Sequence, residues 1–150
     1  MKANSLKLIA RTSEDLKVIS AHLQDSIVKT SDIANLTKNR IFLIQLNRFM
    51  WEDVEKGVFR KNKRIRTVLK FENVLKVTSR NINQKKKDRF LDFLAIETIQ
   101  MPDKNYEMNL IFSGDNVIKV IVEALEVTLD DQGNPWESKS KPKHKNLWGK

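Results

Sequence analysis

The chain has 150 residues, of which 40% are hydrophobic and 31% charged, and its formal net charge at pH 7 is +9. It has no cysteine, which excludes disulfides, thiolate metal sites and a cysteine nucleophile. Its two histidines, His22 and His144, lie far apart in the sequence, which argues against a zinc site. No apolar run approaches the roughly 18 residues of a membrane span, and the first residues lack the pattern of a secretory signal, so we expect a soluble, cytoplasmic protein without membrane association.

The N-terminal residues predict a short strand followed by an amphipathic helix. Residues 6–10 carry the strand, and Thr12 and Asp15 then stand at the spacing of a capping box. Leu16, Ile19 and Leu23 form one apolar stripe over residues 13–25. We expect this helix to pack on a sheet.

A short strand is expected at residues 26–29, and the nearly continuous apolar run at 40–47 predicts a central strand buried on both faces. Residues 49–63 lose a clear period, so we expect a loop that Phe49 and Trp51 anchor at one end.

Residues 64–80 alternate between apolar side chains at odd positions and mostly basic ones at even positions. Because successive side chains of a strand point to opposite faces, this alternation predicts one buried face and one basic face. The alternation carries through Glu72 and Asn73, so we expect the basic residues to share a surface whether the chain runs on as one bent strand or turns there. The surrounding stretch, 56–89, holds 13 basic and 2 acidic residues, whereas 90–136 holds 2 basic and 9 acidic ones.

Further strands are expected at 90–99, 106–112 and 117–122, the last two joined by a hairpin at 113–116. A bulge is expected within 123–131, with a helical turn as the alternative, and residues 132–135 end the ordered pattern. The predicted architecture is α+β: a mostly antiparallel curved sheet, or a partly closed β-barrel, with one N-terminal amphipathic helix packed against it. Residues 1–136 are expected to form a single domain, and residues 137–150 a flexible Lys-rich tail.

The basic stretch is the main candidate for function, as the contact surface of a non-enzymatic binding module for nucleic acid or an acidic protein surface. The alternative is an ordinary solvated sheet face, since lysine and arginine also protect sheets from aggregation. No aromatic residue alternates with the basic ones, which weakens a single-stranded nucleic acid as the partner. The candidate contact residues are Arg64, Arg66, Lys70, Lys76, Arg80, Lys85, Lys86 and Lys87.

Two other functions compete with this hypothesis. An enzyme would gather His22, Trp51 and Glu52 from separate segments, and a subunit of an assembly would bring the acidic block 90–136 against the basic block of another copy. Asp130 and Asp131 lack the ligand pattern of a calcium loop, so we expect solvated carboxylates there. With four glycines in the chain, neither a dinucleotide fingerprint nor a phosphate loop can be written, and no cofactor is expected.

Residues 20–25 (SAHLQD), residues 47–49 (NRF) with Trp51 and Glu52, and residues 134–136 (NPW) resemble an uncharacterised bacterial family, domain-of-unknown-function family 2948. The similarity extends over nearly the whole chain to Trp136. It implies a small, soluble bacterial protein in the cytoplasm and adds no chemistry.

Overall fold

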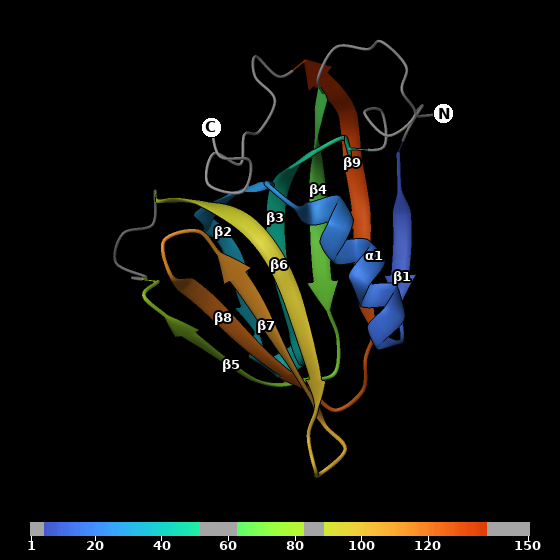
Figure 1. Cartoon of the computed structure of the whole chain (residues 1–150), viewed down its shortest axis with the longest axis vertical. Helices are drawn as coiled ribbons and strands as arrows, with labels where there is room; N and C mark the ends of the chain where they lie inside the picture. Colours follow the sequence, from blue (N-terminus) through green and yellow to red (C-terminus); the bar gives the residue numbers. More distant parts are fainter. Residues whose placement is uncertain (1–4, 52–62, 83–88, 138–150) are drawn as a thin grey trace, which may run out of the picture.

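A single helix lies on a large, strongly bent antiparallel sheet (Figure 1). The computed structural model describes residues 5–51, 63–82 and 89–137, and in these the sheet has nine strands in the order β1-β9-β4-β3-β2-β6-β7-β8-β5. It does not close into a barrel, and the predicted α+β class with a curved antiparallel sheet is confirmed. The elements are β1 (Lys7–Ala10), α1 (Ser13–Leu23), β2 (Ile27–Leu36), the 3₁₀ turn η1 (Thr37–Asn39), β3 (Ile41–Phe49), β4 (Lys63–Phe71), β5 (Val74–Arg80), β6 (Phe90–Gln100), β7 (Tyr106–Phe112), β8 (Asn116–Val122) and β9 (Val127–Glu137).

The sheet has two halves that face each other across the core. The first half consists of β1, β9, β4, β3 and β2, and the second of β6, β7, β8 and β5. They join where β2 pairs with β6 over only three residue pairs, from Ile27↔Asp92 to Lys29↔Phe90. Buried apolar side chains from both halves and from α1 form one cluster.

Helix α1 begins and packs as predicted. The Thr12 hydroxyl accepts a hydrogen bond from the Asp15 amide, and the Asp15 carboxylate accepts one from the Arg11 amide. Leu16, Ile19 and Leu23 are buried, and the helix lies against β6 and β1 (Figure 1).

Strand β3 is central, as predicted, because it pairs with β4 on one side and with β2 on the other. The prediction that both of its faces are buried is wrong. Phe42, Ile44 and Leu46 point into the core, whereas Leu43 is half-buried and Gln45 is exposed. Helix α1 and the second half cover the inner face alone, so the outer face keeps contact with solvent.

The basic stretch forms two strands that belong to different halves. Strand β4 pairs with β3 and β9, whereas β5 pairs with β8 at the end of the sheet order. The chain turns between them at Asn73, which has a positive φ of 58°. Alternation holds in β4, but a register shift between Val74 and Lys76 breaks it in β5. Val74 is therefore buried and Leu75 is 49% exposed, the reverse of the predicted parity.

Strands β7 and β8 form the predicted hairpin, and β6 pairs with β7 as well. Two predictions for the following segment are wrong. Instead of a bulge, the chain leaves β8 after Val122 and crosses to the first half as β9. Strand β9 then continues past the predicted end: Gly133 adopts a positive φ of 68°, and pairing with β4 resumes at Arg64↔Trp136.

Candidate functional site

The cations on β4 are largely committed to contacts within the protein. Arg64 donates hydrogen bonds to the carbonyls of Asp25 and Asn47, both at 3.1 Å, and its guanidinium lies 5.6 Å from the centre of the Phe49 ring. Burial lowers the pKa of Arg64, while the charges of Asp25 and Asp92 oppose that shift. Arg64 therefore serves the fold rather than a solvent-facing surface.

Arg66 is held in a similar way by side chains of the first half. It donates to Gln45 Oε1 at 2.6 Å and forms an ion pair with Asp32 at 3.3 Å. Lys70 differs, since it makes no ion pair within the described part of the chain.

The cations on β5 are accessible. Lys76 is exposed and has no ion-pair partner among the residues that the structure describes. Arg80 reaches Asp115 at 3.1 Å, but the two side chains are 63% and 79% exposed, so this pair is weak. Lys85, Lys86 and Lys87 lie outside the described residues. The predicted contact residues are thus divided between strands that do not pair with each other.

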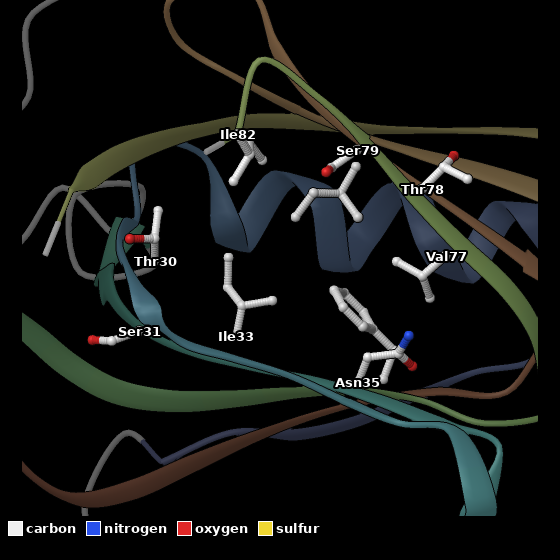
Figure 2. Close-up of a pocket in the computed structure, with 10 residues that line it drawn as sticks. Thr30, Ser31, Ile33, Asn35, Val77, Thr78, Ser79 and Ile82 are labelled. Atoms are coloured by element: carbon white, nitrogen blue, oxygen red, sulfur yellow. The ribbon is translucent and has the colours of Figure 1, made fainter. Parts of the chain in front are cut away.

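A cavity of about 430 Å³ lies between β2 and β5 (Figure 2). Thr30, Ser31, Ile33 and Asn35 line it from the β2 side, and Val77, Thr78, Ser79 and Ile82 line it from the β5 side. Phe42 and Ile118 also contribute to its lining. A second cavity, of about 250 Å³, continues it toward Arg40 and is lined by Asn35, Thr37, Arg40, Val74, Leu75, Lys76 and Val77. We call the two cavities together the slot.

The slot exists because β2 separates from β6. Strand β2 shifts register between Val28 and Ile33, and the Thr30 amide is its last donor toward the second half, bonding the Arg89 carbonyl at 2.8 Å. Within the described residues, 31–36 of β2 then have no backbone partner strand except β3, and 75–80 of β5 have none except β8. Val74 and Arg40 close the narrow end through an amide-to-carbonyl bond of 2.9 Å.

The segments that border the slot are basic. Residues 27–40 and 74–80 hold five lysines and arginines and one acidic residue, Asp32, which pairs with Arg66. Two of the five cations, Arg40 and Arg80, form exposed ion pairs with Glu123 and Asp115. The inner walls are partly apolar, from Ile33, Val77 and Ile82, and partly polar, from serine, threonine and asparagine side chains. Such a mixture of apolar surface and a few polar groups is typical of ligand sites. The volume of the first cavity, about 430 Å³, falls in their usual range of roughly 300–1,000 Å³.

The residues proposed for an enzyme do not line the slot. The Trp51 indole donates to the Gln24 carbonyl at 2.8 Å and packs edge-on against Phe49 at 4.6 Å, so its polar atom serves the end of α1. His22 lies half-buried in the last turn of α1, and Glu52 lies outside the described residues. The described ranges contain no cluster of three or more His, Cys, Asp or Glu side chains suited to a metal ion.

Segments that carry the family resemblance meet around Arg64. Its backbone lies between Phe49 on β3 and Trp136 on β9, and its guanidinium bonds the carbonyls of Asn47 and Asp25. These residues are far apart in the sequence, and the fold brings three of the resembling segments together at Arg64.

The geometry defines an α+β protein in which a bent antiparallel sheet, with one helix packed on it, leaves a slot between two strand edges. In the described residues, no helix has the length and apolar character needed to cross a membrane. The chain belongs to the family described as "Protein of unknown function (DUF2948)", whose model matches residues 6–144, and the resemblance found in the sequence is thereby confirmed. Neither a comparison with curated proteins nor one with solved structures found a match.

Proposed function

We propose that this chain is a non-enzymatic binding module whose basic slot border recognises an anionic partner, which is an acidic protein or a nucleic acid. The observation that carries the proposal is the exposed edge strand β5, on which Lys76 lines the slot and Arg80 directly follows the lining residue Ser79. A cleft lined by charges of one sign attracts an oppositely charged partner.

Within the predicted contact set, the exposed cations are the ones that can bind. Lys76 has no ion pair to break among the described residues, and Arg80 has only an exposed one. Arg64 and Arg66 would have to break internal hydrogen bonds to contact a partner, so we infer that they stabilise the fold. Lys70 and the lysines at 85–87 stay candidate contacts on the strength of their charge alone.

Binding to labelled polyanions tests the proposal. Fluorescence anisotropy with polyglutamate and with a single-stranded oligonucleotide should detect binding at low salt that weakens as salt rises, because counterions compete for the same cations. Lys76→Glu combined with Arg80→Glu should weaken it by about tenfold or more, a loss of roughly 1.4 kcal/mol. Lys17→Glu combined with Lys104→Glu, at exposed positions on α1 and in the turn between β6 and β7, reverses the same number of charges and is the matched control. Absence of binding at low salt, or equal loss in the control, would overturn the proposal.

An assembly subunit is the second candidate, favoured by apolar side chains on the outer face of β6. Phe90, Leu94 and Ile99 are 64%, 40% and 57% exposed, and exposed apolar groups on one strand are typical of an interface. Light scattering across a salt and concentration series tests it. A dimer that Phe90→Ser and Ile99→Ser dissociate would support it, and a monomer at every concentration would exclude it.

A further inference from the structure

We propose that the slot takes an extended acidic peptide, which adds its backbone to the free strand edges of β2 and β5. This inference rests on the proposed function and deepens it, because it names the partner's chemistry and the way in which it binds.

Two strand edges border the same cavity. Residues 31–36 of β2 and 75–80 of β5 border the slot from opposite sides and run in opposite directions along it (Figure 2). Their slot-facing amides and carbonyls have no strand partner within the described residues, apart from the Val74–Arg40 contact at the narrow end. An unpaired edge is a template for another strand, and domains that bind peptides by strand addition use such edges.

The dimensions suit a short strand. Six residues, as in 31–36, span about 20 Å at roughly 3.3 Å per residue. The contact between Val74 and Arg40 closes one end of the slot and so limits the length of the peptide.

The side chains around the slot define the sequence pattern of the peptide. In an extended peptide, alternate side chains point to opposite sides. Those that point inward would contact Ile33, Val77 and Ile82. Those that point outward would meet the cations of β5, of which Lys76 lines the slot and Arg80 directly follows the lining residue Ser79. The expected ligand therefore alternates apolar residues with Asp or Glu.

A polypeptide fits this slot better than a nucleic acid. Phe42 is the one aromatic residue in the lining of the two cavities, and it is 1% exposed, so bases find no ring on which to stack. Unpaired backbone amides and carbonyls are the natural partners of another backbone.

The test uses the full chain and four short labelled peptides in fluorescence anisotropy. The first alternates Val and Glu. The second has the same sequence with N-methylated backbone amides, which keeps the charge and removes the backbone hydrogen-bond donors. The third replaces each Glu by Gln. The fourth has the same composition as the first but places all Glu residues in one block. The first should bind best, and N-methylation should weaken binding by about tenfold, because two or more hydrogen bonds are lost.

Two protein variants locate the binding. Ser79→Trp places a bulky side chain in the slot and should weaken binding of the Val/Glu peptide by about tenfold or more, the effect of blocking a site. Gln100→Trp, at the exposed end of β6, is the matched control and should bind like the unsubstituted protein. Circular dichroism melting shows that both variants fold, and protection of the β5 amides from hydrogen exchange in the unsubstituted protein tests strand addition without any variant.

The outcomes separate the two proposals. Equal binding of the methylated, block and alternating peptides, with loss in the Lys76→Glu and Arg80→Glu variant, would overturn strand addition while the anionic-partner function stands. Equal binding of the Val/Gln peptide would overturn the acidic specificity. Failure of polyglutamate, the oligonucleotide and all four peptides to bind would overturn both.

Discussion

Arg48 on β3 and Asp131 on β9 form a fully buried bidentate ion pair across the intervening strand β4. Nε of Arg48 lies 2.9 Å from Oδ1, and a terminal nitrogen lies 2.7 Å from Oδ2. The Thr67 hydroxyl on β4 donates to Oδ1 at 2.7 Å, and the Leu6 amide donates to Oδ2 at 2.8 Å. The expectation of a solvated carboxylate at Asp131 is therefore wrong. Within the first half, this carboxylate links β3, β4, β9 and the residue that precedes β1.

Asp131→Asn should lower the free energy of unfolding by about 3–5 kcal/mol, because it leaves the guanidinium of Arg48 buried without its counter-ion. The combined replacement Arg48→Met, Thr67→Val and Asp131→Leu removes all three polar side chains and should recover most of that loss. Urea denaturation measures both. A triple variant no more stable than Asp131→Asn would contradict this view of the network.

Stability should also fall in acid through Asp131. Burial raises its pKa, but the hydrogen bonds and charge of Arg48, with those from Thr67 and Leu6, outweigh burial and hold the pKa below its ordinary value. Because the folded pKa is the lower one, the carboxylate contributes stability above about pH 4 and loses it as pH falls through the folded value. The difference in unfolding free energy between the unsubstituted protein and Asp131→Asn should therefore shrink below about pH 4. Parallel pH profiles would show that this carboxylate is not the titrating group.

Arg64 and Lys70 lie on the same face of β4 and should behave differently. Arg64→Met should lower stability by about 1.5–3 kcal/mol, the range for a hydrogen bond from a charged group, because it removes the bonds to Asp25 and Asn47. Lys70→Met should change stability by less than about 0.5 kcal/mol. Thermal unfolding of the two variants checks this. Equal effects would mean that Arg64 is as free as Lys70.

Asn73 sets the direction of the chain between the two halves. Its φ of 58° is costly for a β-branched residue, so Asn73→Val should lower stability by about 1–2 kcal/mol. Asn73→Gly fits this φ and loses one long side-chain contact to the Ala124 carbonyl, so it should stay within about 0.5 kcal/mol of the unsubstituted protein. Chemical denaturation distinguishes the pair, and a valine variant as stable as the glycine variant would contradict the assigned role.

Local patterns predicted the elements that local physics decides. The spacing of Leu16, Ile19 and Leu23 predicted α1, and alternation predicted β4 and β7, because each element has one face on a common core. Strand β9 was predicted to end too early, since Gly133 and Pro135 are typical of a chain break. In the structure, Gly133 supplies an irregularity after which pairing resumes.

The slot and the buried pair could not be predicted from local patterns. Arg48 and Asp131 form their ion pair although they are 83 positions apart in the sequence, and the residues around each of them do not indicate its partner. The slot depends on how many residues of β2 pair with β6 before the two strands separate. It also depends on β5 being the last strand of the sheet, on the other side of the slot from β2. The irregularity at Leu75 arises from the way in which β5 pairs with β8. The alternating pattern of residues 64–80 carries no information about that pairing.

An NMR titration of the isotope-labelled full chain with the Val/Glu peptide tests directly whether the slot is the binding site. Saturable amide shifts concentrated at 31–36 and 75–81, on the two borders of the slot, are the predicted result. Shifts centred instead on the outer face of β4, around Arg66 and Lys70, or spread evenly over the lysines of the chain, would contradict a binding module built on this slot.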